Sequence, residues 1–311
     1  MKDNKRLFIF AAYDAQGLID ATLLHYLSCL SGVGDIVLTF DSDIQDTEID
    51  KLKSVKNIKT IINGRHGEYD FGSYKHGFGY AKNNKLLDNY DWVYFVNDSV
   101  FGALWDIKTM LADLESRNVD LTGVFEFANT EIPAHVQSWF VGMAKALVNE
   151  NFVAEFFNSV AHQDDKQLII LKYEVRLTQL VLQHGYKMST LVSGQNGKNY
   201  CMYNNPLGML KYGVPFIKKA ALENLCGKDF LYSFTDEKFV DDIAKYATRN
   251  GLAFGEISQI VRPQYKKVFR FTFAGIPIVA MYKQKASEYT TNYKVCLFDK
   301  LPIFKVTLNN E

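Results

Sequence analysis

Apolar runs alternate with segments of helical periodicity along most of this chain. Residues 7–13 form a continuous apolar run, and residues 17–30 then carry apolar side chains at helical spacing, which predicts a strand followed by a helix. The same order repeats downstream. Further strands are predicted at the apolar runs 36–40, 58–62, 92–96, 121–125, 137–141 and 187–192. Further helices are predicted at residues 47–55, 74–82, 107–117, 145–160 and 166–184.

This alternation predicts an α/β fold, with a mixed, mostly parallel sheet of about six or seven strands flanked by helices on both faces. In such sheets the ligand binds beyond the carboxyl ends of the strands. The polar residues that follow the apolar runs are therefore the candidates for chemistry. They are residues 13–14, 41–43 and 97–99.

The pattern changes after the last of these strands, and the change divides the chain into three. Residues 193–205 are rich in Gly, Asn and Ser, which marks a connection or a substrate loop. Short helices are predicted beyond it at residues 220–225 and 237–250. We therefore expect three domains: an α/β domain over residues 1–210, a helical extension over 211–262 and a C-terminal tail over 263–311.

The tail is both basic and apolar. It carries eight Lys or Arg residues against three acids, and one short pattern occurs in it twice, at residues 273–278 and 298–303. These properties suit contact with anionic lipid headgroups, where each nearby Lys or Arg contributes about 1 kcal/mol. The alternative is a β-hairpin packed on the main domain. Single short strands cannot span a bilayer.

Composition narrows the classes of protein. Hydrophobic residues make up 48% of the 311 residues, which supports a buried core and argues against a disordered chain. The 35 basic and 35 acidic side chains cancel, so the net charge gives no reason to expect nucleic acid as a partner. The four cysteines lack the spacing of a zinc site, which indicates reduced, mostly buried thiols and no redox cofactor.

The N-terminus and the lengths of the apolar runs bear on location. Residues 1–6 are charged and lead directly into the first strand, unlike a signal sequence. No apolar run approaches the roughly 20 residues needed to span a bilayer. We therefore expect a cytoplasmic protein, or one held peripherally at the cytoplasmic face of the inner membrane.

The strand predicted at residues 92–96 leads directly into Asn97, Asp98 and Ser99. A carboxylate at the end of such a strand suits a metal-bound diphosphate, because the metal offsets the charge on a departing phosphate. Asp98 offers the hard oxygen ligand that Mg²⁺ or Mn²⁺ prefers. Taken alone, the tripeptide is more often a turn in which Asp98 caps the next helix.

Glu174 lies in a second informative segment, residues 173–187, which has helical apolar spacing and ends at Gly185. We expect Glu174 at the start of this helix, where the helix dipole favours an ionised carboxylate. Such a carboxylate suits a general base that removes a proton from an acceptor hydroxyl. The alternative is an ordinary solvated glutamate in the first helical turn.

A third segment suits sugar binding. In residues 134–142, the polar residues His135, Gln137 and Ser138 interrupt an apolar context, and Trp139 supplies a flat face. Aromatic faces cover the C–H groups of sugars, while amides and imidazoles match their hydroxyls. His135 equally fits an ordinary hydrogen-bonded strand position.

A fourth segment, residues 65–77, places three glycines among charged residues just before a predicted helix. Backbone amides freed by glycine, together with Arg65 and Lys75, would be able to cradle nucleotide phosphates. The segment has neither a Walker nor a Rossmann pattern. A structural loop explains it nearly as well.

Four of these motifs occur in a characteristic order, at residues 67–75, 90–102, 135–140 and 173–178. The order resembles that of the rhamnan synthesis protein F family, bacterial transferases of cell-surface polysaccharide assembly. The similarity covers residues 8–219, including the segment 213–219. It implies a GT-A fold, a nucleotide-sugar donor with dTDP-rhamnose as a candidate, and a lipid-linked or polysaccharide acceptor.

A more distant similarity to the large inverting GT-A transferases supports roles for two residues. It implies that Asp98 is the ligand of a metal or of the diphosphate, and that Glu174 is the catalytic base. Asn97 departs from the pattern, because it replaces the first acid of an Asp-x-Asp motif. Tyr173 and Val175 leave Glu174 as the only acid at the base position. Metal dependence therefore stays open.

Together these observations predict an inverting, nucleotide-sugar-dependent glycosyltransferase, a hexosyltransferase. The predicted donor-binding residues are Tyr13, Asp14, Asp41, Arg65, Asp70, Lys75, Asn97, Asp98 and Ser99. The predicted residues for the acceptor or sugar are His135, Gln137, Ser138 and Trp139. The alternative is a catalytically silent module that binds a saccharide or a partner enzyme of polysaccharide assembly.

Overall fold

The chain folds into two compact units, Met1–Gly255 and Glu256–Glu311. The computed structural model describes residues 4–129, 131–194, 206–224, 231–252, 254, 266–273, 276–285, 290–297 and 301–309. Most of the predicted loop at 193–205 lies outside these residues, as do Cys201 and Cys226. Cys29 is a free, half-buried thiol. The first unit includes most of the helical extension predicted at residues 211–262. That the chain has three domains with different roles stays a prediction.

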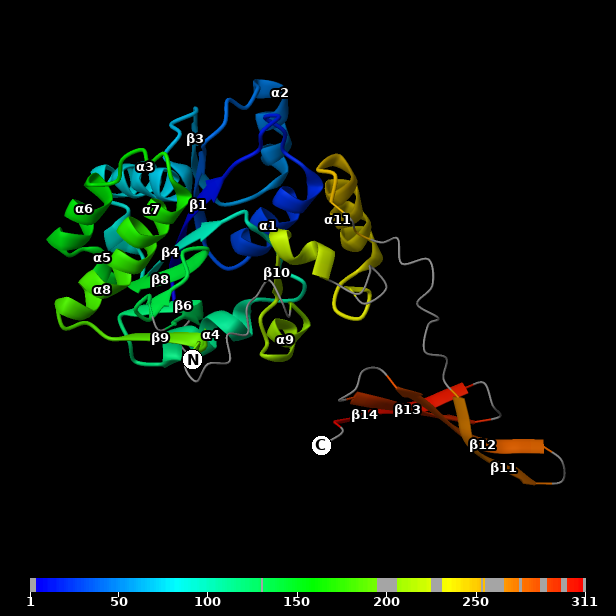
Figure 1. Ribbon diagram of the computed structural model, residues 1–311. Coiled ribbons are helices and arrows are strands. Elements are labelled where there is room, and N and C mark those ends of the chain that lie inside the picture. Colours follow the sequence, from blue (N-terminus) through cyan, green and yellow to red (C-terminus); the bar gives the residue numbers. More distant parts are fainter. Residues whose placement is uncertain are drawn as a thin grey trace. The chain divides into compact units, whose positions relative to one another are not determined.

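An eight-stranded mixed sheet forms the centre of the first unit (Figure 1). Its strands are β1 (Arg6–Ala12), β2 (Asp35–Phe40), β3 (Ile58–Asn63), β4 (Trp92–Asn97), β6 (Leu121–Phe127), β7 (His135–Val136), β8 (Phe140–Ala144) and β9 (Met188–Val192). They lie in the order β3-β2-β1-β4-β8-β6-β7, and β9 pairs with β6. The first four strands are parallel, as are β6 and β9, whereas β8 is antiparallel to both its neighbours. The predicted mixed α/β fold with a mostly parallel sheet is confirmed.

Helices cover both faces of this sheet (Figure 1). One face packs against α3 (Tyr69–Asn83), α5 (Lys145–Val148), α6 (Asn151–Asn158) and α8 (Arg176–Gln183). The other face packs against α1 (Ala21–Ser31) and α4 (Lys108–Ser116). Successive side chains of a strand point to opposite faces. The apolar run of β1 therefore serves both cores, with Leu7 and Ile9 in one and Phe8 and Phe10 in the other.

Shorter elements complete the first unit. The strand β5 (Val100–Gly102), which follows β4 in the chain, forms an antiparallel pair with β10 (Phe216–Lys218). A third core, which includes Phe101 and Ile217, joins this pair to the segments around it. Those segments are α9 (Pro206–Lys211), the 3-10 helix η4 (Lys219–Asn224) and α11 (Glu237–Arg249). Other short helical pieces are α2 (Asp46–Ile49), η1 (Asp50–Ser54) and η2 (Leu87–Asn89).

The structure corrects three predicted boundaries. The helix α1 begins at Ala21 rather than at residue 17, because the Asp20 carboxylate accepts hydrogen bonds from the first helical amides. The helix α3 begins at Tyr69, five residues earlier than predicted. The strand predicted at 137–141 begins three residues later, as β8, because residues 137–139 leave the sheet where the Ser138 amide donates to Glu174 instead of to a strand. The short strand β7 just before them was not predicted and is the eighth strand of the sheet.

The early start of α3 places most of the glycine-rich segment, residues 65–77, inside a helix. Only Gly67, at a φ of +70°, lies in a loop before the helix, whereas Gly72 and Gly77 lie within it. A Cβ at Gly77 would lie 2.5 Å from Cγ2 of Ile9, so glycine there permits α3 to approach β1 closely. The prediction that three glycines free amides for phosphate is therefore wrong for two of them.

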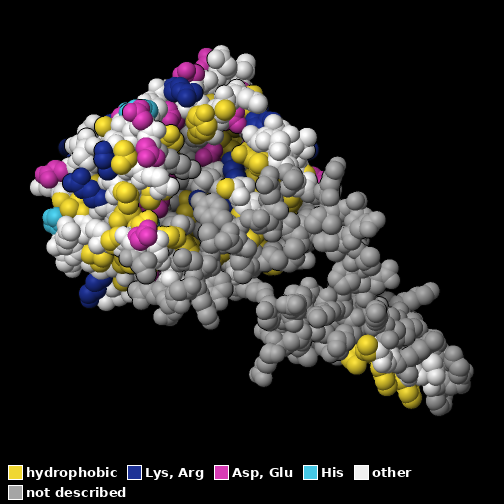
Figure 2. Space-filling view, viewed as in Figure 1, with side chains coloured by type: hydrophobic (Ala, Val, Ile, Leu, Met, Phe, Trp, Pro, Cys, Tyr) yellow, Lys and Arg dark blue, Asp and Glu magenta, His cyan; other side chains and the backbone are white. Residues whose placement is uncertain are grey.

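The second unit contains a four-stranded antiparallel sheet rather than the single hairpin that was predicted. Its strands, in sequence order, are β11 (Lys266–Phe273), β12 (Ile276–Lys285), β13 (Thr290–Leu297) and β14 (Leu301–Asn309). Hydrophobic side chains lie at its surface (Figure 2). Val268, Phe269 and Phe271 of β11 are about half exposed, at 47%, 53% and 51%. Across the described residues, no helix is long and apolar enough to cross a membrane.

Candidate functional site

Two adjoining cavities lie at the carboxyl ends of the parallel strands, the position that open α/β sheets use for ligands. Their volumes are about 530 Å³ and about 480 Å³, within the range of small-molecule sites. We call them the first and the second cavity. Tyr69, Asp70, Asn97 and Ser99 line both cavities. A ligand that fills one would therefore contact the wall of the other.

Asp98 follows β4 and lines the first cavity. Its Oδ2 accepts a hydrogen bond from the Tyr13 amide at 3.3 Å and lies 3.7 Å from the Lys219 ammonium. Burial raises the pKa of Asp98, and the charge of Lys219 opposes this rise. The strand β5 follows Asp98, so the carboxylate does not cap a helix.

Most of the other predicted donor-binding residues also line the first cavity. Tyr13, Asp41, Arg65 and Asp70 lie there beside Asn97, Asp98 and Ser99. The Oδ1 atom of Asp41 accepts the amides of His66 and Gly67, each at 2.8 Å. This carboxylate therefore fixes the loop that leads into α3.

Two predicted donor-binding residues are not among those that line either cavity. Asp14 forms an ion pair with Arg249 at 2.7 Å. Lys75 forms an ion pair with Glu68 at 2.9 Å and donates to the Val160 carbonyl at 2.8 Å. Both side chains are engaged in tertiary contacts, which local sequence patterns do not reveal.

Glu174 lies inside a long helical segment and not at its start. The helix α7 (Lys166–Ile169), the π-helical turn η3 (Ile170–Val175) and α8 follow one another without a break. Glu174 is on the π-helical turn, a feature that is frequent at functional sites. The prediction that a helix N-terminus keeps this carboxylate ionised is therefore wrong.

Side chains from other elements hold the charge of Glu174 instead. Its Oε1 pairs with Nε2 of His135 at 3.2 Å, and its Oε2 accepts from the Ser138 hydroxyl and, at 2.9 Å, from the Ser138 amide. Burial acts to raise the pKa of Glu174, but the hydrogen bonds from His135 and Ser138 outweigh it and lower the pKa. The carboxylate is thus ionised at neutral pH.

His135 is almost fully buried, and both of its ring nitrogens face acceptors. Nδ1 lies 2.8 Å from the Pro133 carbonyl and Nε2 faces Glu174. Two acceptors favour the doubly protonated imidazolium. Burial acts to lower the pKa of His135, but these hydrogen bonds raise it overall. The ordinary strand role considered for His135 is compatible with this geometry, because the residue lies on β7.

Asp70 joins the two cavities. Its Oδ2 accepts the side-chain amide of Asn97 at 2.9 Å and lies 3.4 Å from the Ser138 hydroxyl, which also donates to Glu174. Burial raises the pKa of Asp70, and the neighbouring charge of Glu174 raises it further. Asp70, whose pKa is raised, and Glu174, whose pKa is lowered, therefore both lie beside the hydroxyl of Ser138.

The predicted acceptor-binding residues all line the second cavity, together with Glu174. Trp139 is only 2% exposed and packs edge to face against Phe216. Its Nε1 and the Oε1 of Gln137 are buried without a hydrogen-bond partner in the described part of the chain. Trp139 is thus a buried residue of the cavity wall and not the open stacking face that was expected.

Two lysines of the site were not among the predicted residues. Lys218, the last residue of β10, and Lys219 line the second cavity. The ammonium of Lys218 donates to the Ser99 hydroxyl at 2.7 Å and lies 5.4 Å from the ring centre of Trp139. Lys218 and Lys219 are the last two residues of segment 213–219, which is part of the family resemblance. Nothing in their spacing along the chain relates them to Ser99.

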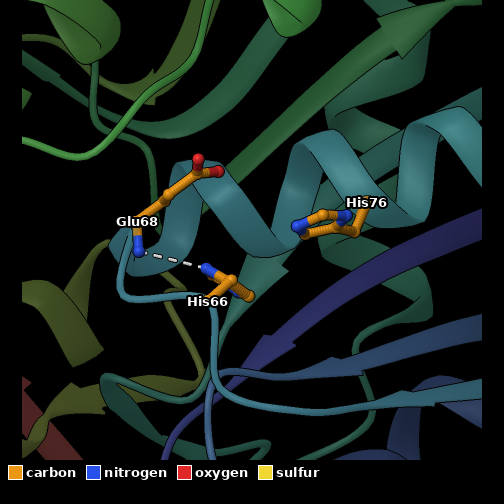
Figure 3. A group of neighbouring side chains, drawn as sticks. All are labelled: His66, Glu68 and His76. Carbon is orange, nitrogen blue, oxygen red and sulfur yellow. Dashed lines mark hydrogen bonds between the residues drawn. The ribbon is translucent and has the colours of Figure 1, made fainter.

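One group of side chains has the residue types of a metal site (Figure 3). His66, Glu68 and His76 place potential ligand atoms within 4.8 Å of one another. Both Glu68 oxygens accept from Lys75, and Nδ1 of His66 accepts the Glu68 amide, shown dashed in Figure 3. These contacts already satisfy the oxygens of Glu68 and one nitrogen of His66, so the group is better described as a structural cluster.

The fold and the site define an α/β protein with a polar, carboxylate-bearing double cavity at the carboxyl edge of a parallel sheet. Within that class, the chain belongs to the rhamnan synthesis protein F family, whose model matches residues 36–306. The match confirms the family that the sequence motifs resembled.

Curated relatives match over parts of the chain. A protein of Sinorhizobium fredii, the uncharacterized protein y4gN, is 23% identical over 191 residues, covering 60% of this chain and 49% of that protein. The virulence protein VirA of Vibrio anguillarum is 29% identical over 125 residues, covering 40% of this chain and 39% of that protein. The chain thus spans about half or less of the length of these relatives.

Solved structures are similar at low sequence identity. Residues 1–349 of TarS from S. aureus match with a TM-score of 0.35 and 10% identity, covering 92% of this chain and 97% of that one. Core-mannan synthase A from Aspergillus fumigatus, in its Mn/GDP form, matches with a TM-score of 0.31 and 10% identity, covering 50% of this chain and 63% of that one.

Proposed function

We propose that this protein is a glycosyltransferase that moves a sugar from a nucleoside diphosphate to a hydroxyl acceptor. The observation that carries the proposal is the paired cavities. Asp98 lines the first, Glu174 lines the second, and Asp70, Asn97 and Ser99 line the wall between them. Transfer requires a donor pocket and an acceptor pocket that meet at one bond, and this arrangement provides such a meeting point.

In this proposal the donor occupies the first cavity and its sugar reaches the shared wall. The acceptor hydroxyl enters the second cavity beside Glu174. Its oxygen attacks the anomeric carbon, the bond from that carbon to the diphosphate breaks, and the diphosphate leaves with the electron pair. Glu174 takes the hydroxyl proton. Attack opposite the leaving group would invert the anomeric centre.

The contacts of Glu174 favour Oε1 as the atom that takes the proton. Oε2 already receives two hydrogen bonds from Ser138, whereas Oε1 receives one from His135. A carboxylate oxygen has two lone pairs, so Oε1 keeps one for the acceptor. The imidazolium of His135 would then donate a hydrogen bond to the other lone pair of Oε1 and so position the carboxylate.

The family suggests candidates for the donor sugar and for the acceptor. We propose dTDP-rhamnose as the first donor to examine, and a growing cell-surface polysaccharide or its lipid-linked precursor as the acceptor. The GT-A variety of α/β fold belongs to the same expectation. Capsule and lipopolysaccharide are the bacterial polymers that such a transfer would serve.

The direct test is turnover. Purified protein incubated with a panel of nucleotide sugars should release the nucleoside diphosphate from at least one donor, faster when a saccharide acceptor is present. A nucleotide at 100 times its dissociation constant should also stabilise the fold by about 2.7 kcal/mol. Neither release nor stabilisation by any nucleotide would favour the silent saccharide- or partner-binding module.

A membrane contact is proposed for the second unit. Val268, Phe269 and Phe271 are exposed apolar residues on one strand, and the surrounding tail sequence is basic. Full-length protein should float with vesicles that contain anionic lipid and remain behind with neutral ones. The double change Phe269→Ser and Phe271→Ser should reduce flotation, whereas Leu182→Ser, at a 39% exposed site in the first unit, should not. Equal flotation of all three proteins would end this proposal.

A further inference from the structure

The residues beside Asp98 decide whether this position can hold a divalent cation. A divalent cation at a nucleotide site is usually held by one or two carboxylates together with the substrate phosphates and water. Asp98 supplies one carboxylate, and the neighbouring position is Asn97, whose Oδ1 accepts the amide and hydroxyl of Ser99. Asp98 is therefore not joined by a second carboxylate from its own strand end.

Two acids whose charges act on Asp98 are paired with another residue. Asp14 and Asp20, whose charges act on the pKa of Asp98, both pair with Arg249, at 2.7 Å and 3.0 Å. Among the described residues, the one group with the spacing of a metal site contains His66 and not Asp98. A divalent cation at Asp98 would have to compete with the Lys219 ammonium for this carboxylate, which argues against tight binding of a metal ion there.

A cation of the chain itself already faces Asp98. The Lys219 ammonium lies 3.7 Å from its Oδ2, and it also lies over the ring of Tyr246 at 4.5 Å from the centre. Its backbone amide donates to the Ser99 carbonyl at 2.9 Å. Lys219 is therefore fixed against the strand end by both its backbone and its side chain.

Lys218 adds a second positive charge at the same place. It pairs with Val100 in the β5–β10 ladder, it is 7% exposed, and its ammonium reaches the Ser99 hydroxyl. Its charge also acts on the pKa of Asp70 in the shared wall. A largely desolvated ammonium interacts strongly with an incoming anion, because little water screens it.

Both lysines line the second cavity, but the Lys218 ammonium reaches Ser99 and the Lys219 ammonium faces Asp98, and these two partners line the first cavity. We propose that Lys218 and Lys219 stabilise the diphosphate of the donor from this position, so that this protein binds nucleoside diphosphates without a divalent metal. Fixed lysines offset the charge that develops on a departing phosphate as a metal ion does. In this arrangement Asp98 is a positioning residue that orients Lys219. The inference rests on the proposed glycosyltransferase function.

The first test needs no variant. Titration calorimetry of the full chain with a panel of nucleoside diphosphates, in chelator and then with Mg²⁺ or Mn²⁺, should give the same affinity within about twofold. Binding that appears only with the metal would overturn the inference and leave the proposed function standing. Absence of binding under every condition would remove both.

Variants then separate the lysines from Asp98. Lys219→Met and Lys218→Met should each weaken nucleotide binding at least about tenfold, the size expected for loss of a charge-assisted contact. Lys53→Met, at a 77% exposed side chain on η1, is the matched control and should change nothing. Asp98→Asn should retain binding, because the amide oxygen can still accept from Lys219 and the lysines carry the charge, whereas loss of a metal ligand would abolish it. Abolished binding in Asp98→Asn would refute the inference even if Lys218→Met failed to fold.

Discussion

Replacing Glu174 with Gln is expected to lower kcat by about 10²- to 10⁴-fold, the usual contribution of a general base. Gln keeps the shape of the side chain: its oxygen can accept from Ser138, and its NH2 group can donate to Nε2 of a neutral His135 that keeps its proton on Nδ1. The affinity for the nucleoside diphosphate should remain unchanged, because Glu174 lines the second cavity and not the first. Steady-state kinetics and calorimetry on the same protein measure the two effects separately.

The control for this experiment is Glu155→Gln, at an exposed position on α6, which should leave kcat unaltered. The pH profile provides a further readout. Because the pKa of Glu174 lies below its usual 4.5, the base stays ionised as the pH falls, and the acid limb of kcat should appear only below that value. Full activity in Glu174→Gln would remove this residue from the mechanism.

Replacing Arg6 with Met is expected to reduce the free energy of unfolding by about 3–5 kcal/mol, because it leaves a buried carboxylate without its cation. Arg6 and Glu115 are 8% and 4% exposed and form two hydrogen bonds, at 2.6 Å and 2.8 Å. The hydroxyl of Tyr94 also donates to Glu115 at 2.9 Å. This ion pair connects β1 to α4 at the edge of the core.

Thermal unfolding should show a fall in Tm on the order of 10 °C for Arg6→Met. The exposed pair of Lys53 and Asp50, whose side chains are 77% and 62% exposed, provides the comparison. Lys53→Met should change the stability by less than about 1 kcal/mol, because solvent screens that pair. Similar losses in the two variants would mean that burial does not govern the strength of the Arg6 pair.

Glu174 shows which features of the site the order of the sequence motifs predicted and which it did not. Its helical segment was predicted, and Glu174 lines a cavity that shares a wall with that of Asp98. The reason given for its ionisation was wrong. His135 and Ser138, 39 and 36 residues away in the chain, hold the charge that a helix dipole was expected to hold.

The glycine-rich segment illustrates the opposite case. Asp41, Arg65 and Asp70 were predicted to meet the donor and do line the first cavity, but Lys75 pairs with Glu68 away from it. Gly77 was read as a loop residue, yet it is the point where α3 approaches Ile9 of β1. A glycine that permits a close approach and one that frees a loop look alike in sequence.

The sequence by itself determined most strands of the large sheet, most of the helices and the edge of the sheet where chemistry would gather. These features follow from periodicity among near neighbours, which each segment carries on its own. Only the tertiary structure decided that Asp70 meets Ser138 across 68 residues, that Lys218 reaches Ser99 across 119, and that Arg6 is a core residue paired across 109. Such contacts depend on how the helices and strands pack together, and no local pattern specifies them.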